Sequence, residues 1–185
     1  GNRLAPAVAS VNWPGHGVLQ IGVAPLEDWV RERNRFYDPG FVSKDPGFHH
    51  AHITVLAPLH EWNLGAISAI AQRTPPFDIV LNEVDVFRNG IIHLIPTPGA
   101  PLRELTRQVW AAHPSVVPNG APSPTPHLTL DAVSTTVDLA STRRAIAALL
   151  PAHHHVFEMQ LVWYESGNCH EMHRWRLGGH ETMSP

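Results

Sequence analysis

Apolar residues near the start of the chain alternate between strand-like and helix-like spacing. Residues 17–23 form a short apolar run that ends before a proline, which is typical of a buried strand. Residues 26–37 and 64–73 instead carry apolar side chains three or four positions apart, the spacing of one helical face. Between these helices, the apolar run that begins at His52 predicts another strand. The order is therefore strand, helix, strand, helix.

The rest of the chain continues this mixture. Residues 77–87 and 91–96 predict a hairpin, because the Asn-Gly between them favours a tight turn. The later segments are two helices, over residues 101–112 and 139–150, and three strands, from His127, over 156–164 and over 172–177. Because hairpins and helices interleave, we expect an α+β fold built on a mixed, mainly antiparallel sheet.

Two of the predicted strands begin with the same short motif. His52-Ile53-Thr54 opens one strand and His127-Leu128-Thr129 opens the other. In a strand, residues i and i+2 point to the same side, so each motif puts an imidazole and a hydroxyl on one face. Two such strands brought together form a cleft with two imidazoles. Such a pair can transfer protons on either side of a phosphate.

A single His-x-Thr in a strand is weak evidence. Histidine is often packed or on the surface, threonine favours strands, and this chain holds 14 histidines. Two copies in matching strands, one in each half of the chain, are harder to explain by accident. We therefore expect His52 and His127 to be catalytic, and Thr54 and Thr129 to bind substrate.

The sequence resembles the two-histidine phosphoesterases, which include RNA 2′-5′ ligase-like proteins and cyclic nucleotide phosphodiesterases. The resemblance is carried by His52-Ile53-Thr54-Val55 and by Pro126-His127-Leu128-Thr129-Leu130, and the order of elements agrees over most of residues 16–178. It implies two pseudo-symmetric lobes, with the histidine strands central, helices outside and a cleft between the lobes. It also implies that His127 is the base and His52 the acid in hydrolysis, with the roles reversed in ligation.

Composition bounds the size and the partners. The 185 residues, 43% of them hydrophobic, suit a single domain over 1–185, which we expect to divide into lobes near 16–98 and 99–178. The net charge of −3 and the single lysine, Lys44, argue against a long nucleic acid but allow a small nucleotide or an RNA terminus. The lone Cys169 excludes an internal disulfide. Without an apolar run of 18 residues, we expect no membrane span and a cytoplasmic monomer.

Histidine clusters raise the alternative of a metal protein. The candidates are His49, His50 and His52, the run His153-His154-His155, and the pair His170 and His173. None has the spacing of a familiar zinc motif, and successive histidines in a strand point to opposite faces. We therefore expect neither a metal nor another cofactor.

Aromatic and basic residues provide further candidates for substrate binding. Phe48, in the loop before the first motif, and Tyr164 are candidates for stacking on a nucleobase, with Phe48 expected at the rim of the cleft. Trp163 lies in an apolar run, which favours the core. Arginines suit phosphate, although each is more often a solvated charge, and the candidates are Arg88, Arg174 and Arg176.

These observations favour a metal-independent phosphodiesterase. The resemblance points to a 2′,3′-cyclic phosphate or a 2′-5′ linkage, in a small nucleotide or at an RNA end, as the reactive group, with RNA 2′-5′ ligation as the reverse activity. The alternative is a binding module of the same fold that holds a nucleotide without turning it over. Matched acid and base groups count against that alternative, because binding alone does not need them.

Overall fold

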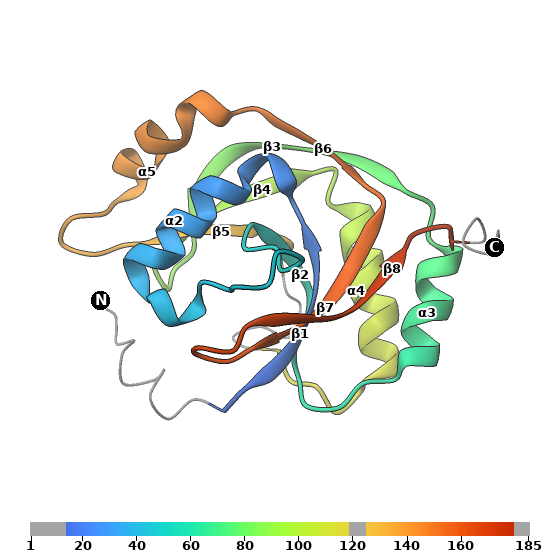
Figure 1. Cartoon of the computed structure of the whole chain (residues 1–185). Helices are drawn as coiled ribbons and strands as arrows, with labels where there is room; N and C mark the ends of the chain where they lie inside the picture. The colour runs from blue at the N-terminus through green and yellow to red at the C-terminus, as the bar shows by residue number, and fades with distance from the viewer. Residues whose placement is uncertain (1–13, 119–124, 180–185) are drawn as a thin grey trace.

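A single curled sheet of eight strands organises the computed structural model, which describes residues 14–118 and 125–179 (Figure 1). The strands are β1 His16–Gly22, β2 His52–Leu59, β3 Phe77–Val86, β4 Ile91–Thr97, β5 Leu128–Ala132, β6 Ala152–Val156, β7 Glu158–Tyr164 and β8 His170–Arg176. The longer helices are α2 Glu27–Tyr37, α3 Leu64–Arg73, α4 Ala100–Ala112 and α5 Leu139–Ile146. The predicted α+β class is confirmed, and every neighbouring pair of strands is antiparallel.

The strand order is β6-β3-β4-β5-β2-β1-β7-β8, so the two histidine strands β2 and β5 are central neighbours. Each forms the inner edge of a four-stranded half of the sheet. One half is β2-β1-β7-β8 and the other is β5-β4-β3-β6. Each half of the sheet therefore mixes strands from the first and the second half of the chain. The lobe boundaries predicted at 16–98 and 99–178 are wrong, because the chain crosses between the halves after β2 and again after β6. A single domain over 1–185 stays a prediction.

Helices α3 and α4 lie side by side against one face of the sheet (Figure 1). Leu102, Leu105 and Val109, spaced along one side of α4, are buried in the same core cluster as Ile53 and Val55 of β2. The apolar positions of both His-x-Thr motifs, Ile53 and Leu128, thus belong to the same hydrophobic core.

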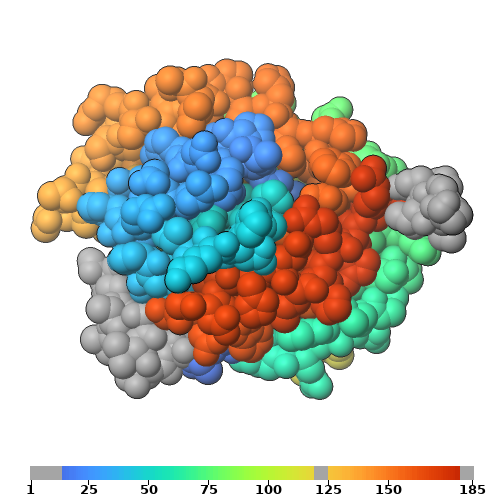
Figure 2. All heavy atoms as spheres, in the orientation of Figure 1, coloured from blue at the N-terminus to red at the C-terminus, as the bar shows by residue number. Residues whose placement is uncertain are grey.

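The connection between α2 and β2, residues 38–51, packs between α2 and β8 (Figure 2). Asp45 accepts a hydrogen bond from the Glu171 amide (2.8 Å), and the Gly47 carbonyl accepts one from Arg174 (3.0 Å). These contacts with β8 hold the connection in place, and it leads directly into His52.

Two predicted elements are divided in the structure. The strand predicted over 156–164 is divided at Phe157, because β6 pairs with β3 whereas β7 pairs with β1. The helix predicted over 139–150 ends as an α-helix at Ile146 and continues as a 3-10 turn. Among the described residues, no helix combines the length and apolar character needed to cross a bilayer.

Candidate active site

The two His-x-Thr motifs meet at the centre of the sheet. Ile53 of β2 pairs with Leu128 of β5, and both side chains are buried, with 1% and 0% of their surface exposed. The flanking histidine and threonine of each motif therefore point to the opposite face. Extended by one residue in each direction, the antiparallel register sets His52 opposite Thr129 and Thr54 opposite His127.

A cavity of about 570 Å³ opens beside these residues. Its lining includes Thr54, His127 and Thr129, together with Phe87 and Arg88 from the end and turn of the β3–β4 hairpin. Thr106 of α4 also lines it, and the Thr106 hydroxyl donates to the Val55 carbonyl (2.8 Å). His52 is not part of this lining, so the cavity lies on the His127 side of the motif pair.

Each motif histidine is held by the same type of hydrogen bond, from its ring to the carbonyl two residues earlier. The Nδ1–H of His52 donates to the carbonyl of His50 (2.9 Å), and that of His127 donates to the carbonyl of Thr125 (2.7 Å). A carbonyl oxygen only accepts, so Nδ1 carries the proton in each ring. In the neutral imidazole, Nε2 is then left with a free lone pair for proton transfer.

Burial disfavours the protonated, charged form of both rings. Burial is the main cause that lowers the pKa of His52, to about 4; the nearby His127 also lowers it, while the His50 carbonyl and the charge of Glu27 act in the opposite direction. Burial also lowers the pKa of His127, with a smaller contribution from His93. Both imidazoles are therefore neutral near pH 7, and an anion bound between them would favour protonation of one.

A third histidine, which the sequence analysis missed, lies beside the second motif. His93 of β4 pairs with Thr129, is buried, and stacks on Phe87 with ring centroids 3.7 Å apart. The ring of His127 contacts both edge-on, at 5.5 Å from His93 and 4.9 Å from Phe87. The pairing of β4 with β5 places His93 beside the second motif, and no local sequence pattern predicts that pairing.

The aromatic candidates lie on the other side of the site, near His52. Phe48 is only 3% exposed and packs against Tyr164 (5.3 Å between ring centroids) and His50 (5.0 Å). Its predicted position at the rim is wrong, because the loop that packs between α2 and β8 buries the ring in a small apolar cluster with Val18, Val162 and Cys169. Tyr164 is partly exposed, with its ring centroid 6.0 Å from that of His52, and burial raises its pKa.

The basic candidates are distributed over the molecule. Arg88 lines the cavity, whereas Arg174 is paired with Glu158 and Glu171 at the edge of the sheet. The Arg176 guanidinium lies 5.5 Å from the centre of the Phe157 ring.

The remaining candidates lie outside this cavity. Trp163 is half-buried, with its indole N–H donating to Glu165 (3.1 Å). In the described parts of the chain, no three His, Cys, Asp or Glu side chains converge as metal ligands would.

Comparisons with known proteins identify structures of the same fold. Among solved structures, E. coli LigT complexed with 3′-AMP superimposes with a TM-score of 0.56, at 20% identity, covering 89% of this chain and 98% of LigT. TT0787 of Thermus thermophilus gives 0.57 at 17% identity, covering 89% of this chain and 99% of TT0787. These likenesses show a shared fold. No curated protein sequence matches the chain.

The family model of the 2′-5′ RNA ligase superfamily matches residues 23–168, which include both His-x-Thr motifs and six of the eight strands, β2 to β7. The match covers most of the chain and agrees with the fold and with the resemblance of the motifs. The chain therefore belongs to the 2′-5′ RNA ligase superfamily of two-histidine phosphoesterases.

Proposed function

We propose that this protein is a metal-independent phosphodiesterase that acts on a 2′,3′-cyclic phosphate or a 2′-5′ linkage in a small nucleotide or at an RNA end. The observation that carries the proposal is the matched pair of imidazoles. Each has its Nδ1 proton committed to a backbone carbonyl, and each belongs to a motif whose threonine is on the same face. This arrangement suits proton transfer at two oxygens of one phosphate.

In hydrolysis of a cyclic phosphate, one neutral imidazole takes a proton from water as the water oxygen attacks phosphorus. The other histidine, as an imidazolium, gives its proton to the ribose oxygen as the bond from phosphorus to that oxygen breaks. The hydroxyls of Thr54 and Thr129 hydrogen-bond the non-bridging oxygens and stabilise their developing charge. By family resemblance His127 is the base and His52 the acid in hydrolysis. In ligation a ribose hydroxyl takes the place of water: it attacks phosphorus and loses its proton to one histidine, the bond from phosphorus to one oxygen of the cyclic phosphate breaks, and that oxygen takes a proton from the other histidine, with the two roles exchanged.

The cavity supports a small nucleotide as the substrate. Its volume of about 570 Å³ lies within the range of sites for small molecules. Phe87 offers an aromatic surface and Arg88 a cation beside His127. Structures of LigT, which shares the fold, are described as complexes with 3′-AMP, NADP+, ATP and phosphate. In this proposal Arg88 binds a second phosphate or the ribose side of the substrate.

A panel of 2′,3′-cyclic and 2′-5′-linked nucleotides, assayed with purified protein in a chelator, tests the proposal. We expect turnover that the chelator leaves unchanged, because imidazoles supply both the acid and the base. Turnover lost in chelator and restored by zinc or manganese would contradict the mechanism. Tight binding of 3′-AMP without turnover of any panel member would instead favour the binding module. Sedimentation of the same protein tests the expected monomer.

A further inference from the structure

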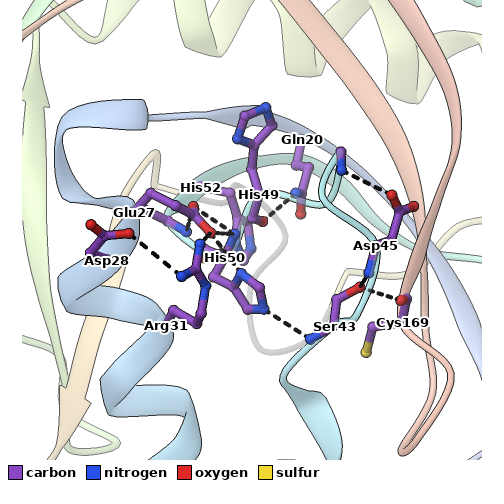
Figure 3. A network of polar contacts seen from close by, with 12 residues as sticks. Gln20, Glu27, Asp28, Arg31, Ser43, Asp45, His49, His50, His52 and Cys169 are labelled. Carbon is purple, nitrogen blue, oxygen red and sulfur yellow. Dashed lines mark hydrogen bonds and ion pairs between the residues drawn. The ribbon is translucent and has the colours of Figure 1, made fainter.

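Each motif histidine donates its Nδ1–H to the backbone carbonyl two residues earlier, but the two peptide groups that supply these carbonyls differ in composition. The carbonyl that holds His52 belongs to the peptide group between His50 and Ala51. The N–H of that same peptide group donates to the Glu27 carboxylate (3.0 Å). Figure 3 shows Glu27, His50 and His52 gathered at this turn of the chain. We propose that Glu27 is a positioning residue for His52, acting through the peptide group between His50 and Ala51.

The carboxylate is itself fixed by several donors. The His50 amide donates to it (2.8 Å), and so does the Nδ1–H of the His50 ring (2.7 Å). The Ser43 amide donates to Nε2 of the same ring (3.0 Å), so Nε2 is the acceptor and Nδ1 carries the proton. The His50 side chain is 2% exposed and that of Glu27 is 16% exposed. The carboxylate is therefore held at one position relative to the peptide group.

Glu27 keeps its negative charge in this setting. Burial alone would raise its pKa, but the hydrogen bonds from the His50 ring and from the two backbone N–H groups outweigh burial, and the pKa is lowered. A charged acceptor on the N–H side of an amide polarises the amide and makes its carbonyl a stronger acceptor. The carbonyl then holds the Nδ1–H of His52 more firmly, and more so when that ring is an imidazolium. No proton crosses the peptide group, and Glu27 stays ionised throughout.

The second motif lacks the chemical means for this arrangement. The carbonyl that holds His127 belongs to the peptide group between Thr125 and Pro126. A proline nitrogen has no hydrogen, so that peptide group has no donor to offer a carboxylate. The two histidines therefore make the same hydrogen bond to a carbonyl, but only the peptide group behind His52 also bonds a charged carboxylate.

Other groups around the pair also bear on its protonation. His127 and the ring of His50 disfavour a positive charge on His52, and Tyr164 lies against its ring. Arg31 lies 3.7 Å from the Glu27 carboxylate and 3.6 Å from Asp28, so it offsets part of the charge of Glu27. A test must therefore change the charge of Glu27 while leaving these neighbours in place.

Glu27→Gln keeps the shape of the side chain and removes its charge. In a ¹⁵N-detected NMR titration without substrate, with the His52 resonance assigned from His52→Gln, we expect the pKa of His52 to fall in the variant. This measurement does not depend on the proposed function. On the substrate found in the nucleotide panel, we expect kcat to fall by about 10-fold to 100-fold with little change in KM. The limb of the pH–rate profile that His52 controls should move to lower pH.

Asp131→Asn is the matched control for folding. Asp131 of β5 accepts hydrogen bonds from Tyr37 of α2 (2.7 Å) and Thr142 of α5 (2.6 Å), so the variant loosens the same helix without touching the His50 carbonyl. We expect a lower Tm and an unchanged pKa for His52.

Glu27→Asp, which keeps the charge, should retain more of kcat than Glu27→Gln. The proposal is overturned if the pKa of His52 is the same in wild type and a folded Glu27→Gln, or if Asp131→Asn lowers it equally. It is also overturned if Glu27→Asp and Glu27→Gln lose kcat to the same extent.

Discussion

The surroundings of His52 and His127 differ more than their motifs do. On the His52 side, a partly buried network of Glu27, His50 and Ser43 lies behind the ring, and Tyr164 lies beside it, with the ring centroids 6.0 Å apart. On the His127 side, the support is a proline peptide, and the ring borders an open cavity beside Phe87 and His93. The duplicated motif thus gives both imidazoles a similar backbone hydrogen bond, and their different neighbours make the two rings unequal in charge environment and in access to the cavity.

That inequality is useful for acid–base catalysis. Two interacting imidazoles in identical environments would share a single proton equally, whereas unequal surroundings determine which ring is neutral and which is charged. The cavity that borders His127 does not include the Glu27 network, which lines a separate cavity of about 620 Å³. We expect the body of the nucleotide to lie in the cavity beside His127, with the ring of His52 acting from the side of the Glu27 network.

Removing either imidazole should give the largest effect. His52→Ala and His127→Ala should each lower turnover by about 10²–10⁴-fold, because each deletes a positioned proton-transfer group. Binding of 3′-AMP, measured by calorimetry, should weaken but remain measurable. His170→Ala is a matched control, since its Nδ1 also bonds the carbonyl two residues earlier (3.1 Å) on an outer strand. Near-full activity in both motif variants would refute the two-histidine mechanism.

At acid pH, His52 and His127 should contribute unequally to the loss in free energy of unfolding. The pKa of His52 is about 4 in the folded protein and about 6.5 in an unfolded chain, so below pH 6.5 the unfolded state binds the proton more readily. Stability should fall as the pH decreases from 6.5 to 4, by no more than about 2 kcal/mol from this group, because the ring is partly exposed.

Urea unfolding of wild type and His52→Gln across this pH range measures that contribution. The variant should lose less stability in acid than the wild type does. His127→Gln should show a smaller change of the same sign, because burial lowers the pKa of His127 too. Parallel curves for wild type and His52→Gln would mean that His52 titrates normally.

Much of the fold follows from local patterns, and much of the site does not. Periodicity predicts β1, β2, α2, α3 and the β3–β4 hairpin, because each depends on neighbouring residues. The crossing of the two halves of the sheet depends on which distant strands pair, and no local pattern encodes it.

The same limit applies to individual residues of the site. The motif residues are recognisable because histidine and threonine recur at a spacing of two. Glu27 and His93 acquire their places only through tertiary contacts, and the burial of Phe48 follows from the packing of a loop with no period of its own. Sequence therefore predicts the reactive groups, and the structure adds the groups that make their surroundings differ.

The threonines should matter less than the histidines. Thr54→Ala and Thr129→Ala each remove one neutral hydrogen bond to the phosphate and leave the proton-transfer groups in place, so we expect losses in kcat/KM of about tenfold. Thr54→Ser and Thr129→Ser keep the hydroxyl and should recover most of the rate. A loss as large as that of the histidine variants would indicate that a threonine also holds its neighbouring ring.

The smallest effect should come from Pro126→Ala. The substitution gives the peptide group behind His127 the N–H that its counterpart behind His52 already has. Within the described residues, the influences on the pKa of His127 are burial, the Thr125 carbonyl and His93, with no carboxylate among them. The new N–H therefore has no charge to transmit, and we expect the pKa of His127, followed by NMR, to stay close to its wild-type value. Losing the proline should lower stability by about 0.4–1 kcal/mol through the entropy of the unfolded chain. If instead Pro126→Ala shifted the pKa of His127 as much as Glu27→Gln shifts that of His52, the amide itself rather than the carboxylate would control the ring, and the contrast between the two motifs would lose its electrostatic basis.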